Sequence, residues 1–265
     1  VSSMFEVGKM FANGRGTERD DKKAFHWFEK AAENGSDSAL TQLGIMYYKG
    51  LGISADKSKA ASFFLKAAEK NNSYAQHWLG YMYLYGKGLE KNGELANQWL
   101  SKAADQNETG AIFELGKQYW YGMGVPVNPE KAIVLLQKAG NDGHVIAQRI
   151  LGYIYADGGP EKGIPLDFEK AVQWFEKAAR QDDAAGKMGL ALLTLTGKGT
   201  PKNEEKGIRL LTQSANMNYP SAMELLGDFY REEKGDKKEA EKWYRRAAET
   251  GDKTVIESMK KKGVY

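Results

Sequence analysis

The chain of 265 residues carries 38 basic and 35 acidic residues, so its formal net charge is only +3. This near balance provides no electrostatic drive toward nucleic acid or an anionic membrane, and no apolar run approaches the roughly 18 residues that a membrane-spanning helix needs. Cysteine is absent, which excludes disulfide frameworks, thiol catalysis and cysteine metal sites. The sequence starts at Val1, so we expect a trimmed N-terminus, with a lost signal peptide or lipid anchor left open.

A small residue recurs along the chain with a period of 36. It stands in "LGIMYYKGLG" at Leu43 and again in "LGYMYLYGKG" at Leu79. One interval is 39 residues long because three extra residues lie within "DGGPEKGIPLDF", and alanine replaces glycine after it. A fixed period of this length indicates an array of repeated structural units. We call this recurring position the marker; it is occupied by Gly8, Gly44, Gly80, Gly116, Gly152, Ala191 and Gly227.

Each unit has the pattern of a helix, a glycine-containing loop and a second helix. Around Gly44, for example, Ala39 stands five residues before the marker and Gly50 six residues after it. The Gly-x-Gly of the loop supplies the left-handed backbone that ends the first helix. An Asp or Asn that can cap the second helix then recurs. The predicted caps are Asp20, Asp56, Asn92, Asn128, Asp167 and Asn203.

The pattern Ala-x-x-x-Leu-Gly-x-x-Tyr, then Gly-x-Gly, then Lys-Ala-x-x-Trp-x-x-Lys-Ala-Ala resembles the Sel-one-like repeats, relatives of the tetratricopeptide repeat. The resemblance covers about Met4 to Asp252 in seven units. It implies an all-α fold, a right-handed superhelical solenoid of antiparallel helix pairs, and a role as an adaptor in protein complexes. Some secreted members staple each repeat with cysteines, and this chain lacks them.

We therefore predict a single solenoid domain over residues 1–265, working as a monomer. Its repeats of about 36 residues are expected at 3–35, 36–71, 72–107, 108–143, 144–182, 183–218 and 219–252, with a C-terminal capping half-repeat at 253–265. The three-residue insertion is expected to lengthen only the loop between Gly158 and Asp167.

The first helix of each unit has a core side and a free side. At about 100° per residue, positions −5, −1, +2 and +3 from the marker share one side, which we expect to be core. Positions −3, +1 and +4 lie opposite and vary between units. In such superhelices the first helices line the concave surface, and aromatic residues and Arg are typical of binding hot spots. The candidate partner-binding residues are Tyr48, His77, Tyr81, Phe113, Lys117, Trp120, Arg149 and Tyr153.

The aromatic candidates have an alternative role to partner binding. Several of the rings could instead pack against the helix of the neighbouring unit and contact no ligand. Lys117 and Arg149 are expected to favour an acidic or carboxylate-bearing ligand. On the second helices, tryptophans that recur at one position are expected to be structural: Trp27, Trp99, Trp174 and Trp243.

A search for catalytic and metal-ligating patterns finds none. His26, His77 and His144 are not spaced with other ligands as in His-x-x-x-His, and His77 has no placed nucleophile and carboxylate with which to form a triad. The segment "TGKGTP" at Thr196 lacks the Gly-x-x-x-x-Gly-Lys-Ser/Thr of a phosphate-binding loop. We expect no catalytic residue, no metal and no cofactor.

The leading hypothesis is a non-enzymatic scaffold that binds a peptide or a partner protein in its concave groove, and neither nucleic acid nor the membrane interior. The alternative is a binder of small ligands or cell-wall fragments with weak hydrolase activity, and a third hypothesis is a structural spacer. Resemblance to the family suggests a bacterial envelope, secretion, host-contact or effector-neutralising role. We favour a periplasmic or secreted location over a cytoplasmic one.

Overall fold

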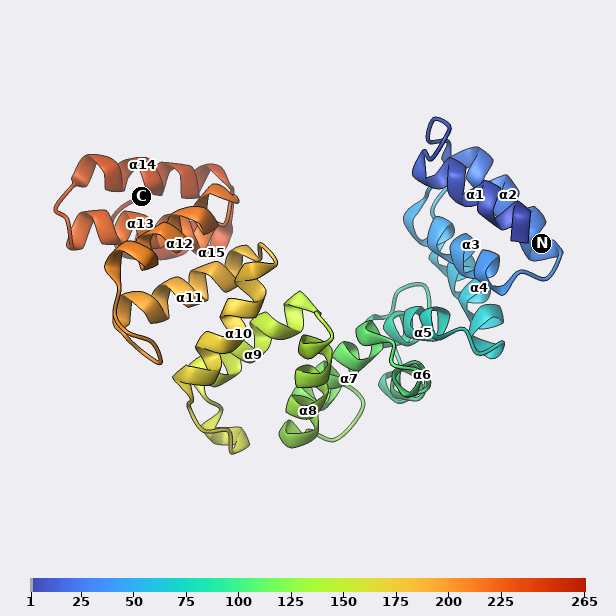
Figure 1. The fold of residues 1–265 in the computed structure, drawn as a ribbon, viewed down its shortest axis with the longest axis horizontal. Helices are drawn as coiled ribbons and strands as arrows, with labels where there is room; N and C mark the ends of the chain where they lie inside the picture. Colours follow the sequence, from blue (N-terminus) through green and yellow to red (C-terminus); the bar gives the residue numbers. More distant parts are fainter. Residues whose placement is uncertain (1) are drawn as a thin grey trace. The chain divides into compact units, whose positions relative to one another are not determined.

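The computed structural model describes residues 2–265 and is built from paired helices (Figure 1). Across those residues the other elements are a 3₁₀ turn at Pro160–Lys162 and an isolated bridge between Gly159 and Ile164. The predicted all-α solenoid of helix pairs is confirmed. The helices are α1 (Ser2–Asn13), α2 (Asp21–Glu33), α3 (Asp37–Lys49), α4 (Lys57–Glu69), α5 (Ser73–Tyr85), α6 (Gly93–Asp105), α7 (Thr109–Tyr121), α8 (Pro129–Asn141), α9 (Val145–Asp157), α10 (Phe168–Arg180), α11 (Ala184–Thr196), α12 (Glu204–Asn216), α13 (Pro220–Glu232), α14 (Lys237–Glu249) and α15 (Lys253–Lys261).

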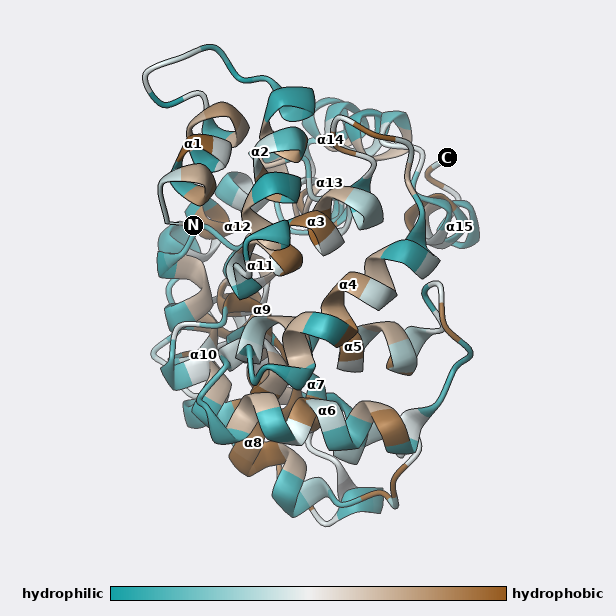
Figure 2. Cartoon of the chain, turned by 90° about the vertical axis from the view of Figure 1, so that its right-hand side faces the viewer, coloured by the Kyte–Doolittle hydropathy of each residue, from teal (hydrophilic) through white to brown (hydrophobic). Residues whose placement is uncertain are grey.

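The chain divides into two compact parts, Val1–Ala139 and Gly140–Tyr265, with the division inside α8. Within each part, odd-numbered helices are the first helices of the units and even-numbered helices are the second. In the first part α1 packs against α2, α3 against α4 and α5 against α6, and in the second part α9 packs against α10, α11 against α12 and α13 against α14. Within each part, a second helix also packs against the first helix of the next unit, as α2 does against α3 and α10 against α11. Hydrophobic and hydrophilic bands alternate along the helices in Figure 2, as expected where one side is buried.

Helix ends follow the predicted capping pattern. The side chain of Asp20 accepts a hydrogen bond from the backbone N–H of Lys23, and the other predicted caps behave alike at the second helices that follow them. At the opposite end of the first helix, Gly50 caps α3 in the left-handed conformation, with φ of +72°. These local signals give nearly every helix the same length, 13 residues from α2 to α14.

The marker glycine lets the two helices of a unit touch. A Cβ built on Gly44 would lie 2.7 Å from Cε1 of Phe64, a ring on the paired helix α4. In the sixth unit the marker is Ala191, and the glycine has moved to Gly207 on α12, where a Cβ would lie 2.6 Å from Cγ of Leu195. Close approach therefore needs one glycine per pair, on either helix.

The second glycine of the loop has a different role, which the sequence did not reveal. Gly88 has φ of +81°, and a Cβ on it would lie 2.5 Å from the carbonyl carbon of Lys57, at the start of α4 in the preceding unit. Gly52 meets the backbone of Asp21 in the same way. The loop thus rests against the N-terminus of the preceding second helix, and glycine is needed for contact between units as well as for the turn.

The recurring tryptophans are less uniform than predicted. Trp174 and Trp243 are buried, with 8% and 6% of their surface exposed, whereas Trp27 and Trp99 are only partly buried. A cation three residues later lies over each of these rings, as Lys102 Nζ does at 4.2 Å from the Trp99 centroid. The deepest core position is the next residue along the second helix, namely Phe28, Phe64, Leu100, Leu136, Phe175 and Leu211.

The three-residue insertion lies in the loop between α9 and α10. Gly159 and Ile164 exchange two backbone hydrogen bonds of 2.9 Å, which close the extra residues into a small turn. The flanking helices α9 and α10 keep the common length of 13 residues.

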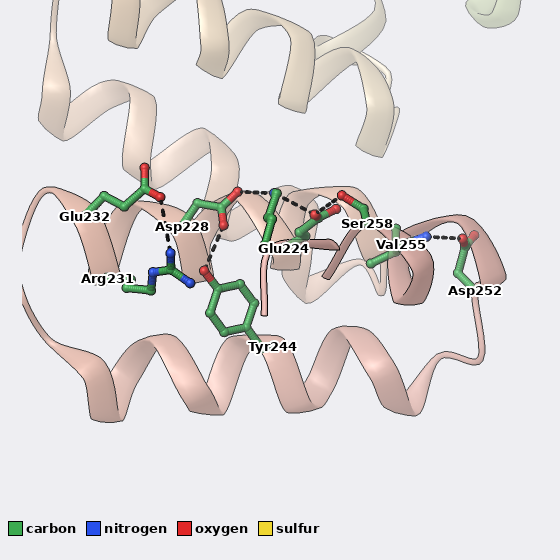
Figure 3. Close-up of polar contacts among 9 residues, drawn as sticks. Glu224, Asp228, Arg231, Glu232, Tyr244, Asp252, Val255 and Ser258 are labelled. Atoms are coloured by element: carbon green, nitrogen blue, oxygen red, sulfur yellow. Dashed lines mark hydrogen bonds and ion pairs between the residues drawn. The ribbon is translucent and has the colours of Figure 1, made fainter. Parts of the chain in front are cut away.

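The last helix, α15, docks on α13 through polar contacts (Figure 3). Lys262 Nζ lies 2.7 Å from Glu224 Oε1 and 2.6 Å from Asp228 Oδ2, and Ser258 Oγ donates to Glu224 Oε1 at 2.6 Å. Tyr244 Oη donates to the other oxygen of Asp228 at 2.7 Å. Burial opposes the charge of Lys262, but its hydrogen bonds to the two carboxylates prevail and raise its pKa. Glu224 and Asp228 stand at positions −3 and +1 of α13, so α15 covers the side of α13 that corresponds to the predicted free side.

Candidate protein-binding pocket

Three consecutive first helices in the Val1–Ala139 part form one cavity of about 220 Å³. We call it the aromatic pocket; it is lined by Tyr48 of α3, by His77, Trp78 and Tyr81 of α5, and by Glu114 of α7. Because every lining residue comes from a first helix, the cavity lies where the sequence predicted a binding face.

Trp78 is the centre of a cluster of rings. It stacks on the fully buried Phe64, with centroids 5.4 Å apart and planes 1° from parallel. Tyr48 lies 5.0 Å and Tyr81 5.9 Å from it, both steeply inclined to its plane. Tyr74, which is 43% exposed, extends the cluster at 6.3 Å. The rings on the rim therefore pack against Trp78, which itself packs on a ring in the core.

Glu114 supplies a carboxylate in the pocket although only 7% of its surface is exposed. Tyr85 Oη donates to Glu114 Oε2 at 2.8 Å, and Lys117 Nζ lies 3.1 Å from Oε2 and 3.3 Å from Oε1. Lys117 also donates to Tyr85 Oη. Burial, followed by the charge of Glu114, raises the pKa of Tyr85, so the phenol stays protonated and acts as a donor. This network compensates for the cost of burying the carboxylate.

His77 joins α5 to the start of α7. Its Nδ1 lies 3.0 Å from Glu108 Oε2, a contact that is an ion pair only when the imidazole is protonated, and Nδ1 forms no hydrogen bond within residues 2–265. Glu108 also caps α7 by accepting from the N–H of Ala111 at 2.6 Å. Burial alone would raise the pKa of Glu108, but the imidazole and the N–H groups of Ala111 and Gly110 lower it. The imidazole lies on the backbone at Gly110, where a Cβ would be 2.9 Å from Nδ1.

The structure brings three of the predicted binding residues together, since Tyr48, His77 and Tyr81 all line the aromatic pocket. Phe113 is 6% exposed and lies under the ammonium group of Lys117, 5.0 Å from its centroid. Neither residue is among those that line the pocket. Trp120 is partly buried and lies outside the lining.

The remaining two predicted residues belong to the Gly140–Tyr265 part and are described there by themselves. Arg149 Nη1 donates to Asp183 Oδ2 at 2.9 Å. Tyr153 Oη donates to the carbonyl of Ala185 at 3.4 Å, and its ring packs edge-on against Phe175 at 5.0 Å. Arg149 thus contacts the capping carboxylate of the following first helix, as His77 does in its own part of the chain.

These contacts remove the basis for expecting an acidic ligand. Lys117 is paired with Glu114 and Arg149 with Asp183, both within 3.1 Å. An acidic ligand would have to displace a carboxylate that the chain already provides. The pairs were not predictable from the candidate list alone, because Glu114 stands at position −2 of its helix and Asp183 is the residue that caps α11.

Trp78 and Glu114 line the pocket although neither was predicted to bind. Both stand at position −2 from the marker, three residues before position +1. Residues three apart on a helix lie on the same side, so including position −2 with −3, +1 and +4 would have found them from the sequence.

Neither a metal centre nor a membrane span emerges from the side chains and helices of residues 2–265. No three His, Asp or Glu side chains within that range come close enough to hold an ion. None of the helices there combines the length and the apolar character required to cross a bilayer.

Comparison with known proteins identifies the repeat. The model of the Sel1 repeat matches seven times, at residues 1–36, 37–72, 73–108, 109–144, 145–183, 184–219 and 220–252. The crystal structure of c5321, a protective antigen of uropathogenic Escherichia coli strains, is 33% identical with a TM-score of 0.78 and aligns over 96% of this chain and 54% of that one. A Sel1 repeat protein from Oxalobacter formigenes is 28% identical with a TM-score of 0.82, over 93% of this chain and 99% of that one.

A curated relative is the chitin synthase regulator SKT5 of Saccharomyces cerevisiae, 31% identical over 123 residues. This match covers 44% of the chain, but only 17% of the regulator; a second curated relative, from Neisseria meningitidis, is covered over 21% of its length. The chain therefore spans a small share of the curated relatives that it matches. Since the repeat model accounts for residues 1–252, the chain belongs to the Sel1 repeat family and is a Sel1-repeat scaffold.

Proposed function

We propose that this Sel1-repeat scaffold binds a partner protein or peptide without catalysing a reaction, and that the aromatic pocket receives an anchoring side chain of the partner. The observation that carries the proposal is the cavity itself, where three consecutive first helices contribute Tyr48, Trp78 and Tyr81 around a space of about 220 Å³. Tyr and Trp are enriched among the residues that dominate binding energies. Rings that already pack against other rings have less side-chain freedom to lose when a partner binds.

The relatives support this class of function. The yeast relative is named a regulator of chitin synthase, which is an action directed at another protein. The E. coli relative is described as a protective antigen, and on that similarity we propose a periplasmic or secreted bacterial protein. We propose that the chain acts as a monomer.

The alternative, a binder of small ligands or cell-wall fragments with weak hydrolase activity, receives less support. Pockets for small molecules commonly measure about 300–1,000 Å³, and the aromatic pocket is smaller. Hydrolysis of a glycosidic bond commonly uses two carboxylates that flank the bond, and Glu114 is the one carboxylate among the lining residues. A structural spacer would not need aromatic side chains around a cavity.

The test is a comparison of variants in partner capture. The immobilised chain is incubated with lysate of its source cell, and bound proteins are identified by mass spectrometry. The double variant Tyr48→Ala, Tyr81→Ala empties two sides of the pocket and leaves the stacked pair of Trp78 and Phe64 in place. We expect it to lose the partner while its circular dichroism spectrum remains that of the parent.

The control changes charges on a second helix. Lys22 and Lys59 are exposed residues of α2 and α4, and their replacement by glutamate should leave capture unchanged. If the control loses the partner and the pocket variant retains it, the binding surface is elsewhere and the proposal is wrong.

A further inference from the structure

We infer that the aromatic pocket selects a basic side chain, a lysine or an arginine, presented by the partner protein. This inference rests on the proposed function and specifies the chemistry of the anchor. It is the opposite of the acidic preference expected from Lys117 and Arg149, both of which are ion-paired within the chain.

The charge of the lining favours a cation. Glu114 is the carboxylate among the lining residues, and although Lys117 pairs with it at 3.1 Å, neither Lys nor Arg is among the residues that line the cavity. Its Oε2 accepts two hydrogen bonds, at 2.8 and 3.1 Å, whereas Oε1 accepts only the longer bond of 3.3 Å from Lys117. A carboxylate oxygen has two lone pairs, so Oε1 has capacity for a further donor.

The rings favour a cation for a second reason. The face of an aromatic ring carries negative charge and attracts ammonium and guanidinium groups within about 6 Å. The chain shows this preference beside the pocket, where Lys57 Nζ lies 5.7 Å from the centroid of Tyr48 and Lys117 Nζ 5.1 Å from that of Tyr85. A ligand cation among Tyr48, Trp78 and Tyr81 would combine several such faces with the carboxylate of Glu114.

The seventh unit provides an internal example of a cation bound on the same side of a first helix. Lys262, the residue that follows α15, places its ammonium group between Glu224 and Asp228, at positions −3 and +1 of α13 (Figure 3 shows the two carboxylates). In α5 the same two positions hold His77 and Tyr81, neither of which is a carboxylate, and the carboxylate of the aromatic pocket is Glu114 of α7. There we expect the cation to come from the partner.

Competing occupants are disfavoured by the same contacts. An acidic side chain could accept from the buried indole N–H of Trp78, which has no hydrogen-bond partner among the described residues. It would, however, lie beside the carboxylate of Glu114, to which Lys117 already donates. An apolar side chain would fill the space and contact the rings, but it would offer no donor to Oε1 of Glu114. These two occupants are therefore the reference ligands in the test.

The experiment titrates the full chain with four capped tripeptides, Gly-X-Gly, in which X is arginine, lysine, norleucine or glutamate. Norleucine has the stem of lysine without its charge. Binding is followed by nuclear magnetic resonance at the indole N–H signal of Trp78, assigned by its loss in Trp78→Phe. We expect the arginine and lysine peptides to bind at least about ten-fold more tightly than the norleucine and glutamate peptides.

Two substitutions test independently whether the aromatic pocket prefers a positively charged side chain. Glu114→Gln keeps an acceptor for Tyr85 but removes the charge, and should weaken the arginine peptide about ten-fold with little change for norleucine. Lys57→Met removes the cation that competes for Tyr48 and should strengthen the arginine peptide about two- to five-fold. Lys22→Met, an equal change of charge on another exposed helix residue, should have no effect.

The inference is overturned if norleucine or glutamate binds as tightly as arginine, if Lys57→Met weakens the arginine peptide, or if no basic peptide shifts Trp78 up to about 50 mM. Any of these results would leave the partner-capture test of the proposed function intact. Conversely, capture that is insensitive to Tyr48→Ala, Tyr81→Ala would refute the proposed function even if the pocket prefers arginine.

Discussion

The contact that the second glycine of the loop makes with the preceding unit can be tested by comparing two alanine substitutions at positions with similar backbone angles. Gly88 and Gly35 have φ of +81° and +87°, so alanine pays the cost of left-handed backbone at both positions. That cost is about 1–2 kcal/mol per residue. They differ in surroundings: nothing lies within 4 Å of a Cβ on Gly35, whereas a Cβ on Gly88 would lie 2.5 Å from the carbonyl carbon and from Cβ of Lys57. The clash on Gly88 involves backbone of the preceding unit, which cannot rotate away.

We therefore expect Gly35→Ala to lower the free energy of unfolding by about 1–2 kcal/mol, and Gly88→Ala by a further 1–3 kcal/mol or so, the usual cost of overpacking. The assay is urea unfolding followed by circular dichroism at 222 nm, with the slopes of the transitions compared before the midpoints are interpreted. Equal losses in the two variants would refute the argument, because backbone angle would then explain the glycine without any contact between units.

Three further predictions concern side chains around the pocket and the last helix. Gly110→Ala should displace the imidazole of His77, because a Cβ on residue 110 would lie 2.9 Å from Nδ1. The nuclear magnetic resonance signals of the His77 ring should shift, while the free energy of unfolding changes by no more than about 1 kcal/mol because alanine favours helix. Unchanged ring signals would contradict this packing. Glu108 has a pKa below its usual 4.5 in the folded chain, so its stabilising contribution is complete above about pH 4.5 and is lost as the pH falls through the lowered pKa. Glu108→Gln should therefore be less stable than the parent in urea at pH 7, with a smaller difference at pH 3; a constant difference would exclude the carboxylate as the cause. Lys262→Met should accelerate hydrogen exchange in α15, because Glu224 loses its ammonium partner. The free energy of unfolding should fall by about 1–2 kcal/mol, as expected for a partly exposed ion pair. Unchanged exchange would show that the apolar contacts of Val255 and Met259 hold the helix.

The sequence could predict the features that repeat, because they arise from local physical chemistry. Asp56 caps α4 through the N–H of Lys59, and Gly50 ends α3 in the left-handed conformation, and both depend on a few neighbouring residues. The marker was also predictable, since a glycine that recurs inside a helix is costly unless another helix passes close to it. The group that the marker contacts, which is the buried ring of Phe64 in the second unit, could be identified only from the structure.

Features that depend on pairs of units could not be predicted in the same way. The ion pair of Arg149 with Asp183 joins residues 34 apart, and nothing in either helix alone indicates that their side chains meet. Likewise, Trp99 and Trp174 share one sequence position but differ in burial. A repeating pattern describes what its copies share. It therefore identifies which helix positions face the core or a neighbouring unit, but it does not determine which contact each copy makes.

His77 and Arg149 show why surface position and binding role must be separated. Both stand at position −3 of a first helix, and both contact the carboxylate that caps the following first helix, Glu108 and Asp183 respectively. Substituting either one would remove a contact between units, so a loss of partner binding could reflect a displaced helix. Tyr48 and Tyr81 line the pocket and pack against the ring of Trp78, and they therefore offer the cleaner test of whether the pocket binds a partner.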